Sequence, residues 1–260
     1  MRDRLLRHRR LLLGSASVIG FVSVWEILFS TVVPWDPFFI TKPSLIASAV
    51  REQILGGRLW HDIAVSAQAF VGGLALAVVV GIPLGVVMGW RRRVAYALDP
   101  LLTALYASPL IALAPLLIIT AGVGIGAKAF LVFLLAVFPF VFNAAAGVRG
   151  TDPVLVNVVR SFGGRERDLY RKVILPSVVP YLVAAARLAV GRGLVGILVG
   201  EFYAASEGLC FAISRFGDTY RLPEMFTGIL VLAVVAVGLT SAVRRLESVV
   251  APWRAGQRDR

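Results

Sequence analysis

Long apolar segments alternate with short polar ones along the chain, and each apolar segment is long enough to cross a bilayer as a helix. Charged residues are sparse inside these segments, as expected of helices that contact lipid. The pattern predicts six transmembrane helices, at about 11–33, 64–89, 100–121, 127–148, 177–204 and 223–243. The expected fold class is therefore an all-α integral membrane protein.

Glycines and prolines add detail to these spans. Pro83 is expected to kink the second span, and Pro109 and Pro115 to break the third. Gly196 and Gly200 in the fifth span are typical of close helix packing. In the second span, small residues at four-residue spacing form a stripe that lets another helix approach, and they are Gly73, Ala77, Gly81, Gly85 and Gly89.

The fifth span also contains Gly191-x-Gly193-x-x-Gly196, the spelling of a dinucleotide-binding fingerprint. That fingerprint requires a preceding strand, and here the surroundings predict a membrane helix. We therefore interpret the match as coincidence. The glycine-rich segment at 122–126 is interpreted in the same way, as an outer turn and not as a phosphate loop.

The longest polar interruption, at 150–180, is rich in basic residues and is expected to lie in the cytoplasm. Asp152 can cap a first short helix, Pro153 suits its first turn, and Gly163-Gly164 permits a left-handed exit into a second. The segment is either an amphipathic surface loop or a docking element for a partner protein. Each helix is expected to carry an apolar ridge, made of Val154, Leu155, Val158, Val159 and Phe162 in the first and of Leu169, Tyr170, Val173 and Ile174 in the second.

Within this segment, VRSFGGRERDLYRKVILPSVVPYL resembles the cytoplasmic coupling loop of ABC importer membrane subunits. That loop is written Glu-Ala-Ala, three residues, Gly, and about nine residues to an Ile-x-Leu-Pro ending. Gly163 matches the glycine, and Leu175-Pro176 matches the ending, which is expected to stop the second helix. The Glu-Ala-Ala positions are occupied by Asn157, Val158 and Val159. The resemblance extends over roughly residues 18–250 and is greatest to the nitrate, sulfonate and taurine branch.

This resemblance implies a type I ABC importer permease. Such a subunit pairs with a second copy as a homodimer, docks two cytoplasmic ATPase subunits and receives its solute from an extracytoplasmic binding protein. ATP and magnesium are then expected on the partner ATPase, with no cofactor bound by this chain. The ATPase-coupling residues implied by the resemblance are Asn157, Val158, Val159, Arg160, Ser161, Phe162, Gly163, Gly164, Leu175 and Pro176.

The composition agrees with a membrane protein, since 58% of residues are hydrophobic, 16% are charged and the mean hydropathy is +0.82. The net charge of +12 could suggest nucleic acid, but the basic residues cluster between apolar runs, which is how membrane orientation is encoded. With both termini inside, 19 of the 27 basic residues lie on the inner side and six on the outer side. We expect a multi-pass protein of the bacterial inner membrane with both termini in the cytoplasm and no nucleic-acid partner.

The expected domain organisation is a basic N-terminus at 1–10, one permease domain at 11–248 and a cytoplasmic tail at 249–260, with the coupling loop at about 150–176. Glu26 in the first span is expected to face protein or the outer interface. In the outer loop at 34–60, Pro43-Ser44 can start an amphipathic helix. A later outer loop holds Arg215, Asp218 and Arg221.

The chain lacks the residue sets that catalysis would need. Cys210 is the single cysteine, and His8 and His61 both lie outside the apolar cores. These residues predict neither a disulfide, nor a metal site, nor a membrane-embedded protease. The sequence contains no Gly-Lys pair and hence no P-loop, so energy from ATP must come through another subunit.

Arg187, Arg192 and Glu201 in the fifth span are candidates for the substrate pathway. One hypothesis is that an arginine attracts a small anionic solute, such as a sulfonate, taurine or nitrate. The other is that each arginine is neutralised by helix carbonyls or by an acid on another helix. For the whole chain, a stand-alone channel or an ion-coupled transporter remains the alternative to an importer subunit, although no inverted repeat or mid-membrane acidic site is evident.

Overall fold

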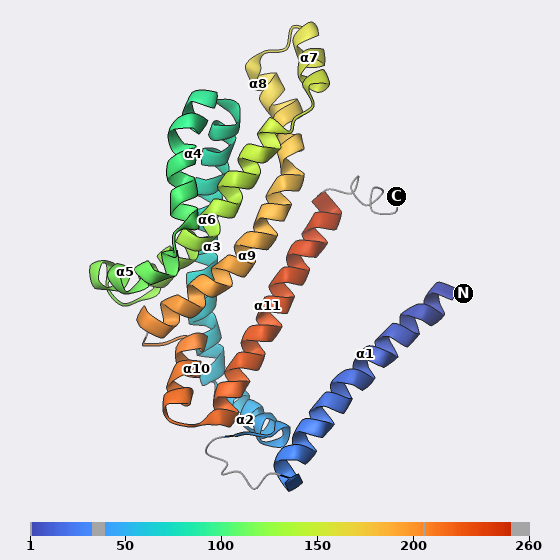
Figure 1. The fold of residues 1–260 in the computed structure, drawn as a ribbon, viewed down its shortest axis with the longest axis vertical. Coiled ribbons are helices and arrows are strands. Elements are labelled where there is room, and N and C mark those ends of the chain that lie inside the picture. The colour runs from blue at the N-terminus through green and yellow to red at the C-terminus, as the bar shows by residue number, and fades with distance from the viewer. Residues whose placement is uncertain (1, 33–39, 205, 251–260) are drawn as a thin grey trace. The chain divides into compact units, whose positions relative to one another are not determined.

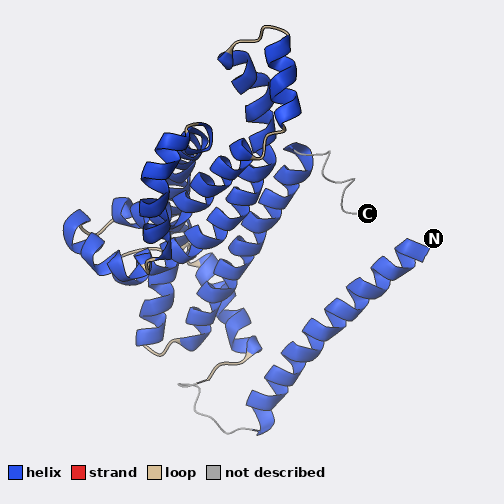
Figure 2. Cartoon of the chain, turned by 45° about the horizontal axis from the view of Figure 1, so that its top comes forward, coloured by secondary structure: helices blue, strands red, loops and turns tan. Residues whose placement is uncertain are grey.

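The computed structural model describes residues 2–32, 40–204 and 206–250, and every regular element in these ranges is a helix (Figure 2). Five helices are long and apolar enough to span a membrane. The number becomes six when the bent pair Arg92–Ala107 and Leu110–Thr120 is counted as one span. The expected all-α membrane fold is confirmed.

The chain forms two compact units. Unit 1 comprises Met1–Asp62 and Ala212–Val231, and unit 2 comprises Ile63–Phe211 and Leu232–Arg260. In chain order (Figure 1) the helices are α1 (Arg2–Ile27), η1 (Leu28–Val32), α2 (Pro43–Leu55), α3 (Arg58–Trp90), α4 (Arg92–Ala107), η2 (Leu110–Leu113), α5 (Ala114–Ala121), α6 (Ile125–Arg149), α7 (Pro153–Ser161), α8 (Glu166–Leu169), η3 (Tyr170–Ile174), α9 (Leu175–Ala204), α10 (Leu209–Asp218) and α11 (Leu222–Val250).

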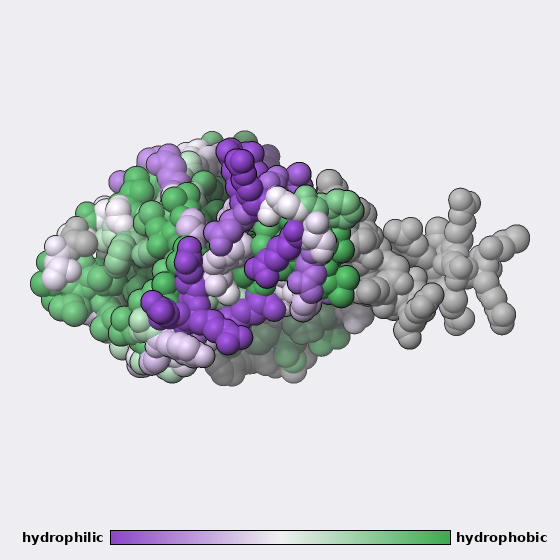
Figure 3. Space-filling view, turned by 90° about the horizontal axis from the view of Figure 1, so that it is seen from above, coloured by the Kyte–Doolittle hydropathy of each residue, from purple (hydrophilic) through white to green (hydrophobic). Residues whose placement is uncertain are grey.

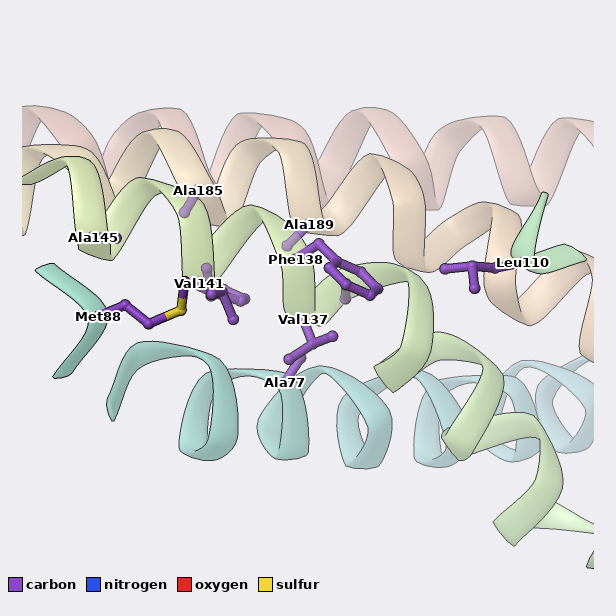
Figure 4. Close-up of a cluster of buried hydrophobic side chains, with 11 residues drawn as sticks. Ala77, Met88, Leu110, Val137, Phe138, Val141, Ala145, Ala185 and Ala189 are labelled. Atoms are coloured by element: carbon purple, nitrogen blue, oxygen red, sulfur yellow. The ribbon is translucent and has the colours of Figure 1, made fainter. Parts of the chain in front are cut away.

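Helix α6 lies at the centre of unit 2, with α3 on one side and α9 on another. Figure 4 shows Ala77 of α3 beside Val137 of α6, and Ala189 of α9 beside Phe138 of α6. These residues belong to the largest buried cluster of the unit. Burial of their apolar side chains against one another fixes the three helices as one packed layer.

The small-residue stripe of α3 lets another helix approach closely, as predicted, and that helix is α6. A Cβ atom added at Gly81 would lie 2.9 Å from Phe140 Cβ, and one added at Gly85 would overlap the carbonyl oxygen of Val141. Gly196 of α9 approaches α6 equally closely, since a Cβ there would lie 2.9 Å from the Val132 Cα. Glycine therefore allows α6 to be enclosed closely from two sides.

The third span differs from its prediction. It begins at Arg92 and contains Pro100 within α4, and it bends by 81° before Leu110. The break falls at Ser108, which is extended (φ −71°, ψ 147°) because a residue before proline avoids the helical conformation. Pro115 does not break the chain, because it lies in the first turn of α5, where its missing N–H has no helical partner.

The Leu-Pro ending of the coupling loop does not stop a helix, contrary to the prediction. The candidate span that contains it runs from Glu166 to Tyr203. Just before Pro176 the helix widens into the π-helical turn η3, in which the Leu175 N–H bonds to the Tyr170 carbonyl. The Ser177 hydroxyl donates to the Val173 carbonyl at 2.7 Å. These bonds accommodate the proline, and the helix continues into α9.

In unit 1, Glu26 of α1 faces protein, as predicted. Its carboxylate accepts hydrogen bonds from the Ser44 N–H at 2.9 Å and the Ser44 hydroxyl at 2.8 Å. An acidic group at this position stabilises the first turn of α2, which begins at Pro43 as expected. The outer loop predicted around Arg215 is instead the helix α10, because its apolar residues recur at helical spacing.

Candidate coupling and pathway sites

Helix α7 and the turn after it form a defined element at one end of unit 2. The Asp152 carboxylate accepts the Val154 N–H at 2.8 Å, and Pro153 occupies the first turn, as predicted. The exit is made by Gly163, whose φ of 71° lies in the left-handed region. A β-branched residue at Gly163 would be strained, so this glycine sets the direction of the following chain.

The apolar ridge of α7 is exposed. Phe162 at its end has 88% of its surface accessible, and Val154 has 64%. Leu155 and Val158 are also exposed, whereas Val159 is half-buried and packs against the core of unit 2. An apolar surface of this kind at the tip of a polar loop is typical of a contact with another protein.

The second helix of the loop does not offer such a surface. Leu169, Val173 and Ile174 are buried in a cluster that includes Val178. The predicted ridge of this helix is therefore part of the core, apart from Tyr170, which remains exposed. Periodicity marks an apolar face but does not say whether the same chain covers it.

The other coupling candidates lie around α7 and at the start of α9. Asn157, Arg160 and Ser161 are exposed, and Ser161 donates to the Asn157 carbonyl at 2.9 Å. A Cβ at Gly164 would lie 2.5 Å from Val159 Cγ1, so this glycine allows the loop to fold against α7. Leu175 and Pro176 are exposed but follow η3, away from the hinge.

Hydrophilic side chains gather around this end of unit 2, which Figure 3 views from the side of α7 and α8. Arg165 begins the second helix, and its N–H donates to the Asp168 carboxylate at 3.2 Å. Asp168 also pairs with Lys172 at 3.2 Å. The α7 ridge therefore lies among charged groups, as expected of a surface in water.

Arg192 of α9 lies against an aromatic group. Its guanidinium is 4.3 Å from the Tyr106 ring centroid and donates to the Tyr106 hydroxyl at 2.6 Å. The Tyr106 ring in turn contacts Phe138 at 5.6 Å and Phe142 at 5.4 Å between centroids. The aromatic groups fix the arginine in place without neutralising its charge.

The three pathway candidates do not form one site. Arg187 is exposed, and it precedes Arg192 by five residues, which places the two on different faces of α9. Glu201 is fully buried and about 13 Å farther along the helix axis than Arg192. Arg192 combines partial exposure with an aromatic partner, Tyr106.

Glu201 takes part in a buried polar network that sequence reasoning did not find. Its carboxylate accepts the Ser66 hydroxyl at 2.6 Å and the Cys210 N–H at 2.7 Å, and it lies 3.7 Å from the Lys128 ammonium. Lys128 is 1% exposed and also donates to the Glu207 carbonyl. The sequence indicates this network only by a lysine at the start of one span, Lys128, and a glutamate at the end of another, Glu201.

No metal site accompanies these groups within 2–32, 40–204 and 206–250. These ranges hold no cluster of three or more histidine, cysteine, aspartate or glutamate side chains that could bind a metal ion. The polar groups of unit 2 therefore offer charge and hydrogen bonds and no metal-ligand set.

Residues 81–255 match the model of a protein family described as the binding-protein-dependent transport system inner membrane component. The match includes the end of α3, the coupling loop and the other helices that follow α3. The fold and the exposed α7 thus define a class, the membrane subunits of solute importers. The chain belongs to this binding-protein-dependent transport family.

Curated relatives match over nearly the whole chain. The chain is 32% identical to the formylaminopyrimidine transport permease protein ThiX of Halalkalibacterium halodurans, over 90% of this chain and 92% of the relative. It is 29% identical to the taurine transport system permease protein TauC of Escherichia coli, over 96% and 91%. Identity to the putative aliphatic sulfonates transport permease protein SsuC of Bacillus subtilis is 30%, over 90% and 84%.

Solved structures show the same fold. An inward-facing structure of the MetNI methionine ABC transporter superposes with a TM-score of 0.60 at 19% identity, covering 82% of this chain and 100% of the other. The fold and family together establish a permease subunit of a binding-protein-dependent ABC importer in the inner membrane. Such a subunit is not catalytic itself, and family membership replaces the alternative of a stand-alone channel.

Proposed function

We propose that α7 is the docking helix for an ATPase subunit and that the importer carries a small anionic solute. The observation that carries the first part is the exposed apolar ridge of α7, which ends in Phe162 with 88% of its surface accessible. A phenylalanine this exposed on a rigid, capped helix is a suitable anchor for a pocket on a partner. The hinge at Gly163 orients that anchor.

The assembly proposed for this chain is a homodimer with two cytoplasmic ATPase subunits. ATP and magnesium bind to the ATPases, and an extracytoplasmic binding protein delivers the solute on the opposite face. Both termini and α7 lie on the cytoplasmic side in this arrangement. The excess of basic residues on that side supports this orientation.

Coupling follows from the continuity of the helix after the hinge. Closure of the ATPases on ATP moves α7, and α7 is joined by one short turn to α8. From Glu166 the helix runs unbroken to Tyr203, passing through Arg192. A displacement at the docking surface therefore reaches the middle of the membrane through one rigid element, and ATP shifts the population between inward-open and outward-open states.

The anionic solute is inferred from Arg192. A guanidinium on a membrane helix is costly in contact with lipid, so a half-exposed one must face protein or a watery pathway. Its aromatic neighbours hold the arginine but supply no negative charge. Two of the relatives are named for taurine and for sulfonates, both of which carry a sulfonate group. We propose that Arg192 attracts such a group, with Arg187 as a second candidate.

Arg192→Gln tests the solute proposal in the assembled complex. Loss of a charge-assisted hydrogen bond lowers affinity by at least about tenfold, so import at subsaturating solute should fall at least that far. ATP hydrolysis stimulated by the loaded binding protein should persist. Arg187→Gln is measured in parallel, and Arg93→Gln at the exposed start of α4 is the control. Normal import by both Arg192→Gln and Arg187→Gln would show that these arginines are structural.

A further inference from the structure

A cavity of about 650 Å³ opens at the same end of unit 2 as the coupling loop, apart from the α7 ridge. It is formed where three helices meet, namely the end of α3, the first turns of α4 and the last residue of α6. The lining residues are Met88, Gly89, Trp90, Arg92, Ala95, Tyr96, Asp99 and Arg149. Neither the coupling mechanism nor the solute pathway uses this cavity.

The charged groups of the cavity are exposed and have no protein partner among the described residues. Arg92 and Arg149 line it from two different helices, and Asp99 lies about two turns beyond Arg92 on the same face of α4. Across the described ranges, none of these three side chains makes a hydrogen bond or an ion pair. Two cations and one carboxylate leave the cavity with a net charge of about +1, which favours an occupant with a single negative charge.

Aromatic residues place the cavity at the level of a membrane interface. Trp90 is the last residue of the α3 span and packs edge-on against Tyr170 at 6.4 Å between ring centroids. Tyr96 is 76% exposed beside the cavity. Tryptophan and tyrosine are enriched where a bilayer meets water.

We propose that this cavity binds the headgroup of an anionic phospholipid, phosphatidylglycerol. The phosphate lies between Arg92 and Arg149, and the glycerol hydroxyls donate to Asp99. The acyl chains extend from the cavity into the bilayer. Basic pockets between membrane helices are suited to anionic headgroups. Phosphatidylglycerol carries one negative charge and matches the cavity, whereas phosphatidylethanolamine is neutral overall and leaves one arginine unbalanced.

This proposal rests on the proposed orientation in one respect. The orientation decides which leaflet supplies the lipid, and that would be the cytoplasmic leaflet. The headgroup would bridge the start of α4 to the end of α6, two helices that meet at the cavity. The bound lipid therefore stabilises the third span, whose bend at Ser108 leaves α4 without a straight continuation.

The test is native mass spectrometry of the detergent-purified full complex titrated with phosphatidylglycerol. The variant is Arg92→Gln with Arg149→Gln, and the matched control is Arg93→Gln, an exposed neighbour that does not line the cavity. One basic residue near an anionic headgroup contributes on the order of 1 kcal/mol, or about fivefold in affinity. The double variant should bind about twenty-five-fold more weakly, and the control should bind like the wild type.

Two further titrations identify the ligand. Phosphatidylethanolamine should bind the wild type more weakly than phosphatidylglycerol, and inorganic phosphate at millimolar concentration should not displace the lipid. Equal binding of the two lipids, displacement by free phosphate, or equal loss in the variant and the control would each overturn the proposal. Loss of the ATPase from the double variant with unchanged lipid binding would instead assign the cavity to protein docking. Because lipid is counted on the permease itself, a failure here is distinguishable from a failure of α7 docking.

Discussion

Lys128 and Glu201 show what a charge requires inside an apolar bundle. Each is almost wholly inaccessible, with 1% and 0% of its surface exposed. The carboxylate is satisfied by Ser66, by the Cys210 N–H and by the nearby ammonium. A fully satisfied network of this kind fixes the position of the helices that contribute to it.

Lys128→Met should destabilise the protein strongly, because it leaves a carboxylate buried without its counter-charge. Removing one partner of a buried pair costs about 3 kcal/mol or more. The measurement is thermal unfolding in detergent. Lys128→Met with Glu201→Gln removes both charges and should recover part of the loss. If the double variant is as unstable as the sum of the two single variants, the pair is not coupled.

Sequence reasoning could anticipate half of this network. Glu201 lies nine residues beyond Arg192, too far for a pair within the helix, so the sequence predicts a partner on another helix or a place at the outer mouth. Which partner it finds depends on how the helices pack, and Lys128 lies at the start of a span where a lysine is ordinary. Gly208 is needed as well, because a Cβ there would overlap the Glu201 carboxylate.

Among the helices, the small-residue stripe on α3 could be predicted fully from the sequence. Small residues at four-residue spacing predict a close helix contact. The identity of the partner, α6, was not predicted, because a stripe does not name the helix that covers it. The glycines of α3 are not equivalent, since a Cβ at Gly72, beside the stripe, would make an ordinary 3.9 Å contact with Ala129 Cβ, whereas one at Gly85 would overlap the Val141 carbonyl oxygen.

Gly85→Ala and Gly72→Ala form a matched pair on α3. At Gly85 a methyl group would overlap the Val141 carbonyl, so we expect a loss of about 1 to 3 kcal/mol from overpacking. At Gly72 the nearest atom would be 3.9 Å away, and alanine should be neutral or stabilising because it favours a helix. The measurement is thermal unfolding of each variant. Equal stability of the two would contradict the close packing of α3 and α6.

Gly163→Val tests the hinge after α7. A β-branched residue at φ 71° costs on the order of 1 to 2 kcal/mol and redirects the second helix. We expect the variant to insert normally but to lose solute-stimulated ATP hydrolysis in the assembled complex. Gly163→Asn is the control, since asparagine tolerates the left-handed region, and it should retain more stimulation.

Asn157→Glu, at an exposed position, should also be tolerated.

Prolines and outer segments were the elements that the sequence described least well. Pro176 was expected to end a helix, but a π-helical turn and the Ser177 hydroxyl accommodate it. Pro109 and Pro115 looked alike, yet only Pro109 breaks the span, because Pro115 lies in a first turn. A proline's effect depends on where the helix begins, and that depends on packing.

For the whole molecule, the apolar segments and their basic flanks predicted the fold class and nearly all the spans. The coupling-loop motif added the family. The orientation is a prediction from the basic residues between the spans, the homodimer is one from the family resemblance, and the anionic solute is one from Arg192 and the relatives. Phe162 ends the exposed ridge of α7, and the whole assembly is proposed to act through this ridge.

Cysteine labelling at Phe162 tests whether α7 lies on the cytoplasmic side and docks the ATPase. The native Cys210 should not react with the label, because it is 1% exposed and burial raises the pKa of its thiol to about 12. Leu55→Cys on α2 is the outer control, because this side chain is exposed. The nearby Gly57 is less suitable for a cysteine, because its φ of 74° favours glycine. A membrane-impermeant maleimide is applied to vesicles of each orientation, with and without the ATPase subunits bound.

We expect a thiol at position 162 to react only from the cytoplasmic side and to be protected when the ATPase is bound. The thiol at position 55 should react only from the outside and should be indifferent to the ATPase. Reaction of position 162 from the outside would contradict the orientation. Reaction from the cytoplasm at the same rate with and without the ATPase would contradict docking on α7.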